Sequence, residues 1–187
     1  MKQIFFSSDH HFLHNNVIKY CNRPYENHEV MNEDLIKKWN AKVGKKDLVY
    51  YLGDFAIDKH KPQKVHADLD SILNRLHGEK ILVYGNHDEV YLDFYQPYFI
   101  QIEKYMDLKI NDLKLSLFHY PIEEWRDQSK GCIHLHGHCH GQSKSTLFNR
   151  YDVGVDCNDY EPKTLDEILL KIKSRDEEIK KEFDIGE

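Results

Sequence analysis

The first half of the chain alternates between short apolar runs and longer amphipathic stretches, and this alternation constrains the possible fold most strongly. The runs at residues 4–7, 48–52 and 81–84 have the length and apolar composition of buried strands. Between them, residues 29–43 repeat apolar side chains at helical spacing, and a second helical pattern begins at Pro62 and stops at Gly78. Strand, helix, strand, helix, strand is the pattern of a parallel α/β layer.

The second half of the chain predicts further strands in a different arrangement. Residues 100–110 and 114–118 flank Asn111-Asp112, a plausible hairpin turn. Residues 132–136 and 151–155 have the composition of additional strands. We therefore expect an α/β fold class in which two packed β-sheets are flanked by helices.

A capping-box sequence near the C-terminus, at residues 164–167, predicts the start of a last helix. Beyond it, residues 174–187 are mostly charged, and we expect a solvated helix end or a frayed tail there. The chain of 187 residues contains no repeat and no linker-like composition. We therefore expect a single domain that spans residues 1–187.

Short motifs rich in aspartate and histidine follow the predicted strands of both halves. In chain order they are Asp9-His10-His11, Gly53-Asp54, Gly85-Asn86-His87-Asp88, a lone His119, and Gly137-His138-Cys139-His140. Ligands usually bind at the strand ends of α/β sheets, so we expect these side chains to serve a common site. Oxygen and nitrogen ligands of this kind suit a pair of divalent metal ions, and such a pair suits the hydrolysis of phosphate esters.

The remaining composition narrows the class of protein. The four cysteines lack C-x-x-C spacing, which argues against a disulfide framework or a cysteine-rich zinc site. A net charge of −6 argues against stable binding of duplex nucleic acid, although two bound divalent ions would still make a phosphate site locally positive. No apolar run is long enough to span a bilayer, and the N-terminus lacks the features of a signal peptide. We therefore expect a cytoplasmic protein with no membrane partner.

Taken in order, the motifs resemble the signature of the calcineurin-like metallophosphoesterases, and in particular their small, compact bacterial and phage-type members. The resemblance extends from Asp9 to His140 in the order that the family shows. It implies a four-layer metallophosphoesterase-like sandwich and a metal-dependent phosphoric ester hydrolase, either a phosphodiesterase or a phosphatase. The implied cofactors are two divalent metal ions, with manganese, iron, zinc and nickel as candidates, and the implied partner is a small phosphate-ester substrate.

The same resemblance implies a role for each motif residue. One ion would be held by Asp9, His11, Asp54 and His140, and the other by Asp54, Asn86, His119 and His138. Asp54 would bridge the two ions. His87 would be the catalytic histidine that protonates the leaving oxygen or stabilises charge on the phosphoryl group.

The sequence departs from the protein-phosphatase branch of this family just after Asp54. That branch continues with an Asp-Arg-Gly element, which supplies an aspartate that orients the catalytic histidine and an arginine that binds phosphate. Here Ile57 stands where the orienting aspartate would be, and Asp58 comes one place late. The departure favours phosphodiesters or small phosphorylated metabolites over proteins as substrates, and it leaves open what orients His87.

Three further residues are candidates for substrate contact. His10 lies between two predicted ligands, Arg23 has a planar fork that suits phosphate, and Trp125 follows His119 closely enough to form a pocket wall. The alternatives are a His10 without a role, an Arg23 on the surface, and a Trp125 packed in the core.

Two alternative functions also stay open: a nuclease that acts on short single strands, and a non-catalytic interaction module with this fold. The presence of His87 and of every ligand position favours an enzyme over the interaction module. The sequence indicates neither the native metal nor the oligomeric state.

Overall fold

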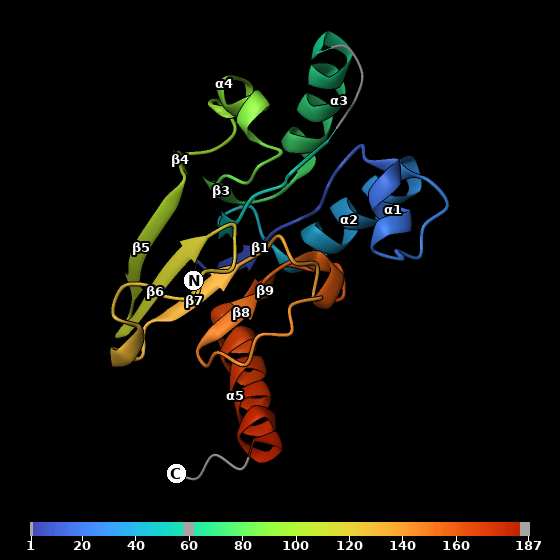
Figure 1. Ribbon diagram of the computed structural model, residues 1–187. Helices are drawn as coiled ribbons and strands as arrows, with labels where there is room; N and C mark the ends of the chain where they lie inside the picture. Colours follow the sequence, from blue (N-terminus) through green and yellow to red (C-terminus); the bar gives the residue numbers. More distant parts are fainter. Residues whose placement is uncertain (1, 58–61, 184–187) are drawn as a thin grey trace.

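Two β-sheets lie against each other in the computed structural model, which describes residues 2–57 and 62–183 (Figure 1). The first sheet has the strand order β4-β3-β2-β1-β9. Strands β1 to β4 are mutually parallel, as the alternating sequence pattern predicts, and β9 runs antiparallel to β1. Its strands are β1 (Ile4–Ser7), β2 (Leu48–Tyr51), β3 (Glu79–Val83), β4 (Gln101–Glu103) and β9 (Lys163–Thr164).

The second sheet has the strand order β5-β6-β7-β8. It contains β5 (Tyr105–Ile110), β6 (Leu113–Phe118), β7 (Ile133–His136) and β8 (Arg150–Asp152). The predicted hairpin at residues 111–112 is confirmed, because β5 and β6 pair antiparallel on either side of it. The predicted strand over residues 100–110 is divided, however, since a bend at Lys104 separates β4 in the first sheet from β5 in the second.

The helices are α1 (Asn15–Tyr20), α2 (His28–Lys42), α3 (Pro62–Arg75), α4 (Leu92–Tyr95) and α5 (Leu165–Glu182), with 3-10 turns η1 (Glu89–Tyr91), η2 (Gln128–Lys130) and η3 (Val155–Cys157). The predicted capping box is present, because Thr164 accepts a hydrogen bond from the backbone of Glu167 and the Glu167 side chain bonds back to Thr164. Most of the predicted tail is helical. Ile179 is buried and Arg175 donates to the carbonyl of Leu147, so α5 is anchored beyond the capping turn.

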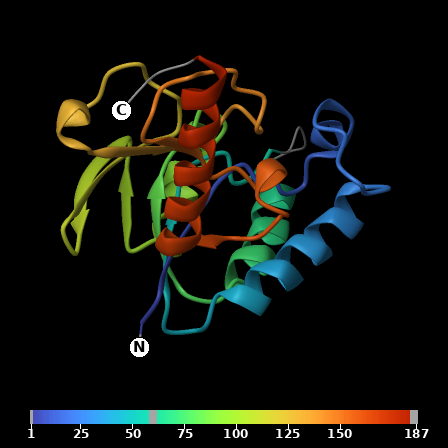
Figure 2. The ribbon, with the colours of Figure 1, turned by 90° about the horizontal axis from the view of Figure 1, so that it is seen from below.

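One hydrophobic core lies between the first sheet and the helices α2 and α3, which cover the same side of the molecule in Figures 1 and 2. Met31, Leu35, Ile36 and Trp39 of α2 recur at helical spacing and are buried against the first sheet. The largest fully buried side chains of this core include Phe5, Met31, Leu35, Trp39 and Tyr51.

A second core lies between the two sheets, and α5 closes it. Phe6 and Val83 of the first sheet meet Leu117 and Leu135 of the second, and Ile168 of α5 completes the cluster. The expectation of two packed sheets flanked by helices is therefore confirmed. On the outer face of the second sheet, Trp125 of the segment after β6 packs against His134.

The carboxyl ends of strands from both sheets meet at one place. Ser8, just after β1, forms a parallel bridge with Gly154, just after β8, and accepts a hydrogen bond from the backbone of Val155. The backbone of Gly137, just after β7, donates to the carbonyl of His119, just after β6. The aspartate- and histidine-rich motifs consequently lie along a single seam between the sheets.

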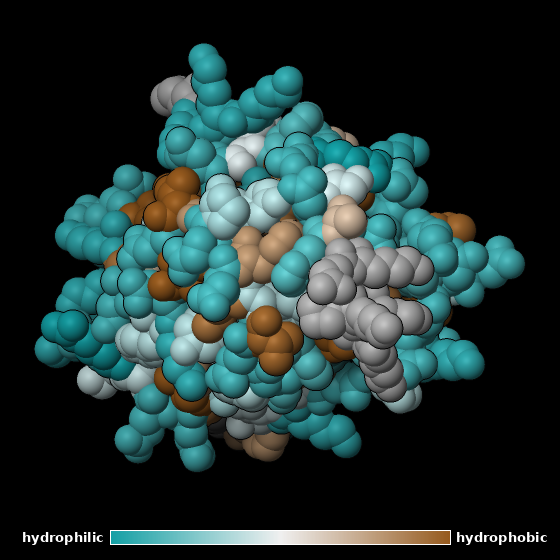
Figure 3. Space-filling view, turned by 90° about the horizontal axis from the view of Figure 1, so that it is seen from above, coloured by the Kyte–Doolittle hydropathy of each residue, from teal (hydrophilic) through white to brown (hydrophobic). Residues whose placement is uncertain are grey.

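The face seen in Figure 3 is mostly hydrophilic, and its hydrophobic side chains lie in separate spots. Large exposed apolar side chains such as Val90 and Ile100 are scattered in this way, which is ordinary for a protein surface. Among the described residues, no helix has both the length and the apolar character that crossing a membrane requires.

Candidate metal centre

Much of the backbone that carries the candidate ligands adopts a conformation that residues other than glycine rarely take. Asp9, His11, Asp54, His138 and His140 all have positive φ angles, of 58°, 51°, 56°, 67° and 49°. Each such residue costs about 1–3 kcal/mol, and such strain concentrates at functional sites. The turns that follow the strands therefore aim these side chains at some expense of folding stability.

One cluster consists of Asp9, His11 and His140. Each offers a ligand atom, and these atoms lie within 4.8 Å of one another. The Asp9 carboxylate is fully buried and accepts hydrogen bonds from the Ser8 hydroxyl at 2.5 Å and from the backbone of His138 at 3.0 and 3.1 Å. Chain segments 129 residues apart are thus joined at one carboxylate.

A second cluster consists of Asp54, His119 and His138, whose ligand atoms also lie within 4.8 Å of one another. Asp54 Oδ2 is 3.4 Å from His119 Nε2 and 3.7 Å from His11 Nε2, which belongs to the first cluster. Asp54 therefore stands between the two clusters, where a bridging ligand would stand.

Asn86 lies on the exposed loop after β3, and its Oδ1 accepts a hydrogen bond from the Tyr120 hydroxyl at 3.1 Å. The Tyr120 ring also lies 4.6 Å from the ring of His138, a member of the second cluster. Tyr120 thus links the loop that carries Asn86 to the loop after β7.

Unpartnered buried nitrogens indicate that the clusters suit a cation. Both ring nitrogens of His11 and the Nε2 of His119 are buried and accept or donate no hydrogen bond. Buried polar atoms are normally paired, and bound metal ions would pair the Nε2 of His119 and one ring nitrogen of His11. Carboxylate and imidazole ligands suit manganese, iron, zinc and nickel, so the residues present fit the predicted ions.

The electrostatics of the ion-free chain agree with this interpretation. Burial raises the pKa of Asp9 to about 7, because its carboxylate is removed from water. Burial alone would lower the pKa of His119, but the neighbouring carboxylates of Asp54, 3.4 Å from its Nε2, and Asp9 raise that pKa to about 9. A positive charge beside Asp9 and Asp54 would keep both carboxylates ionised.

His87 lies at the rim of the clusters with 43% of its side chain exposed. Its backbone N–H donates to Asp54 Oδ1 at 3.0 Å, and its Nε2 is 3.9 Å from Asp54 Oδ2. The ring is accessible to a substrate and fixed to the proposed bridging residue through its own backbone.

Asp88 fixes the loop that carries His87. Its buried carboxylate accepts hydrogen bonds from the backbone N–H groups of Asp54 at 2.7 Å, Gly85 at 2.8 Å and Phe55 at 2.9 Å. The sequence motif contains Asp88, but sequence reasoning gave it no role. Asp58, which was considered for orienting His87, lies outside the described residues.

The structure corrects the three expected substrate contacts by placing all of them in the interior. His10 is fully buried, where its Nδ1 is 3.1 Å from the Tyr51 hydroxyl, and burial lowers its pKa to about 3. Trp125 is buried and its indole N–H donates to the carbonyl of Cys132 at 2.8 Å. Arg23 is buried and its guanidinium is paired with Asp156. Side chains that are buried and engaged in this way do not face a substrate.

Replacing Gly137 by alanine is expected to reduce metal content and activity together. An added Cβ would collide with the Asp9 carboxylate and would lie 2.8 Å from the Cβ of Ser8. Such overpacking typically costs about 1–3 kcal/mol and displaces its neighbours. Elemental analysis and thermal unfolding of the variant measure both effects. Gly131→Ala is the control for metal content: its positive φ angle of 81° should lower the unfolding temperature, but its Cβ meets nothing within 4 Å, so its metal content should be normal. Normal metal content in Gly137→Ala contradicts the expectation.

Comparison with known proteins adds a family match. The chain matches the model of the calcineurin-like phosphoesterases over residues 2–182. It is 36% identical over 179 residues to an uncharacterized protein of Methanocaldococcus jannaschii, and this match covers 92% of the chain and 93% of that protein. It is 29% identical over 186 residues to the gene 66 protein of Mycobacterium phage D29, covering 83% of this chain and 89% of that protein.

Among solved structures, the fold is similar to a protein of unknown function from Aquifex aeolicus, with a TM-score of 0.70 and 23% sequence identity. That match covers 89% of this chain and 97% of the other. It supports the arrangement of two sheets with flanking helices.

Proposed function

Because the chain belongs to the calcineurin-like phosphoesterase family, and is therefore a metal-dependent phosphoester hydrolase, we propose that it uses two divalent ions to cleave phosphodiesters or small phosphorylated metabolites. The observation that carries this proposal is the position of Asp54 between two clusters of potential ligands. A pair of clusters that shares one carboxylate is the arrangement that a two-metal site requires.

In the proposed site, one ion would be held by Asp9, His11, Asp54 and His140, and the other by Asp54, Asn86, His119 and His138. When bound, such a pair of ions supplies a hydroxide nucleophile near neutral pH and stabilises charge on the substrate oxygens. The tight turns hold the ligands before any ion arrives, so little reorganisation accompanies binding.

His87 then acts as the proton donor. Its exposed ring is held at the rim by the backbone bond to Asp54, so it can reach a leaving oxygen on a substrate placed over the clusters. An imidazole has an ordinary pKa near 6.5, which suits proton transfer around neutral pH.

A small or extended substrate is favoured over a phosphoprotein for a structural reason. The arginine nearest to the first ligands, Arg23, is engaged with a carboxylate and is not available to bind a substrate phosphate. The Asp-Arg-Gly element of the protein phosphatases is also missing after Asp54. We also propose that the protein is cytoplasmic.

The proposal predicts two ions per chain and chelator-sensitive activity on diesters. The metal-free protein is reloaded with Mn²⁺, Fe²⁺, Zn²⁺, Ni²⁺ or Mg²⁺, and metal content is measured by elemental analysis. Each form is then assayed with aryl phosphate monoesters and diesters, cyclic nucleotides and short single-stranded oligonucleotides. Cleavage of oligonucleotides in preference to small diesters would favour the nuclease. A single ion under metal-replete conditions contradicts the two-metal proposal, and activity only on a phosphoprotein contradicts the substrate class.

A further inference from the structure

Arg23 and Asp156 form a buried ion pair directly beneath the first cluster. The guanidinium Nε and Nη2 of Arg23 each donate to a different carboxylate oxygen of Asp156 at 2.7 Å. The two side chains are 0% and 5% exposed. This is the two-pronged geometry in which arginine holds a carboxylate most firmly.

The same guanidinium also holds the backbone that carries the first ligands. Nη2 of Arg23 donates to the carbonyl of Asp9 at 2.7 Å, and Nη1 donates to the carbonyl of His10 at 2.8 Å. Both carbonyls belong to the strained turn after β1, where Asp9 has a positive φ angle. Arg23 therefore stabilises the turn that aims Asp9 at the cluster.

Asp156, in turn, holds a ligand from the other end of the chain. Its Oδ2 lies 2.6 Å from Nδ1 of His140. A histidine that binds a metal commonly donates its second ring N–H to a carboxylate, which fixes the ring and increases its basicity. With Nδ1 engaged, Nε2 of His140 is the nitrogen left for an ion.

We propose that Arg23 and Asp156 are positioning residues that set the affinity of one ion, the one held by Asp9, His11 and His140. The pair connects a ligand near residue 9 to a ligand near residue 140 through one guanidinium and one carboxylate. The second cluster relies on a different support, because His119 Nδ1 bonds to the carbonyl of Leu52 at 2.8 Å. The ion pair should therefore act on one ion and spare the other. This inference rests on the proposed two-ion function.

The test is a calorimetric titration of Mn²⁺ into the metal-free chain of 187 residues. Asp156→Asn removes the carboxylate charge at nearly constant volume, and Arg23→Lys keeps the positive charge but cannot hold both carboxylate oxygens and both carbonyls. We expect either change to weaken one of the two binding steps about 10–100-fold and to leave the other step unchanged. Because the two residues act through one contact, the double variant should weaken that step little more than either single change.

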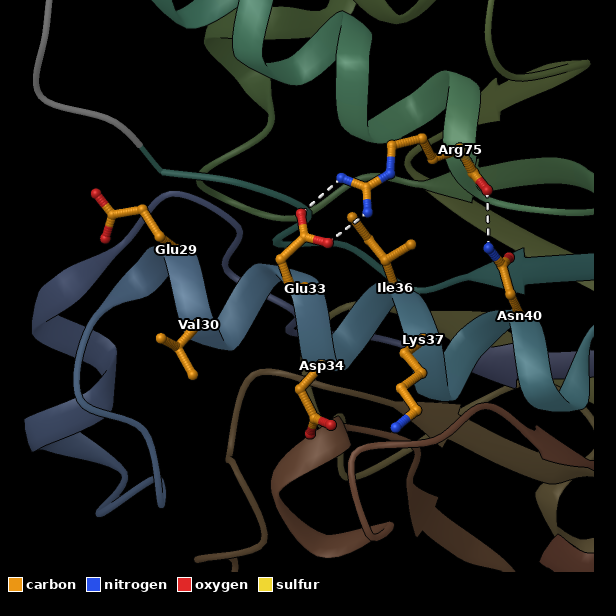
Figure 4. A pocket seen from close by; sticks show the side chains of 8 residues that line it. All are labelled: Glu29, Val30, Glu33, Asp34, Ile36, Lys37, Asn40 and Arg75. Carbon is orange, nitrogen blue, oxygen red and sulfur yellow. Dashed lines mark hydrogen bonds and ion pairs between the residues drawn. The ribbon is translucent and has the colours of Figure 1, made fainter.

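An ion pair with the same two-pronged geometry, far from the clusters, provides the control. Arg75 of α3 donates to both carboxylate oxygens of Glu33 of α2, at 2.6 and 2.7 Å (Figure 4). This pair is exposed, and among the described residues none of its hydrogen bonds reaches a candidate ligand. Arg75→Lys and Glu33→Gln remove the same kind of contact, and both should leave both Mn²⁺ steps unchanged.

Two variant backgrounds show which ion is affected. His138→Ala removes a ligand of the second cluster, and in that background Asp156→Asn should lower the affinity for the one ion that still binds. His11→Ala removes a ligand of the first cluster, and in that background Asp156→Asn should not change the affinity for Mn²⁺. Thermal unfolding in EDTA measures the purely structural effect of each variant, and each titration is done well below that variant's unfolding midpoint.

Equal weakening of both steps, or no change in either, overturns the inference. A wild-type chain that binds a single Mn²⁺ contradicts the two-ion function instead. The single ion is then assigned with His11→Ala. If His11→Ala abolishes its binding, Asp156→Asn must still lower the affinity for that ion. If His11→Ala leaves its binding intact, the inference about Arg23 and Asp156 fails as well.

Discussion

Replacing Asp54 by alanine is expected to remove both metal ions and to abolish turnover. Asp54 Oδ2 lies 3.4 Å from a nitrogen of His119 and 3.7 Å from one of His11, so its loss opens both clusters at once. Metal ions supply several kcal/mol of charge stabilisation to the reaction, which corresponds to a decrease in kcat on the order of 10³-fold or more. Elemental analysis of the purified variant and its kcat on an aryl diester measure both effects.

Asp47→Ala is the matched control for this experiment. Asp47 is also buried, and its carboxylate accepts hydrogen bonds from the backbone of Gln3 at 2.8 Å and Gly44 at 2.7 Å. Its removal should lower the unfolding temperature without changing metal content. If Asp54→Ala retains one full equivalent of metal, Asp54 does not bridge the two positions.

Replacing His87 by alanine is expected to lower kcat about 10²–10⁴-fold while metal content stays at the wild-type level. The side chain is exposed at the rim, and the bond that His87 makes to Asp54 comes from its backbone, which alanine keeps. The decrease should be larger for a diester with a poor leaving group than for an activated aryl ester, because only the poor leaving group needs a proton.

A histidine remote from the clusters provides the comparison. The His66 ring stacks on Phe94 at 4.4 Å, and His66→Ala should leave kcat on both esters unchanged. Wild-type turnover of the poor-leaving-group ester by His87→Ala would show that His87 is not the proton donor.

The local parts of the fold could be predicted from sequence because local patterns determine them. The apolar run 4–7 forms β1 within the same bounds, and the capping box places the start of α5 correctly. The division at Lys104 could not be predicted, since the choice of sheet for β4 and β5 depends on pairing with strands elsewhere in the chain. The burial of Ile179 on α5 likewise depends on tertiary packing, and the charged sequence around it gave no sign of it.

The candidate site shows the same division. Ligand motifs could be found because each is a short run directly after a strand. The role of Arg23 could not be predicted, because its guanidinium pairs with the carboxylate of Asp156, which is 133 residues away in the sequence. A planar guanidinium suits a carboxylate as well as a phosphate, and the sequence alone could not decide between them.

The seam between the sheets has a consequence for how the chain matures. The segments that lead from the first sheet carry Asp9, His11 and Asp54, whereas His119, His138 and His140 follow strands of the second sheet. A nascent chain that has emerged only as far as β3 contains Asp9, His11 and Asp54 but none of the three histidines that complete the two clusters. In the proposed site, an ion that is captured later would cross-link the N-terminal and C-terminal halves, and its binding energy would add to the stability of the docked state alone. The proposed site therefore predicts that the chain acquires its metal only after the two sheets have docked.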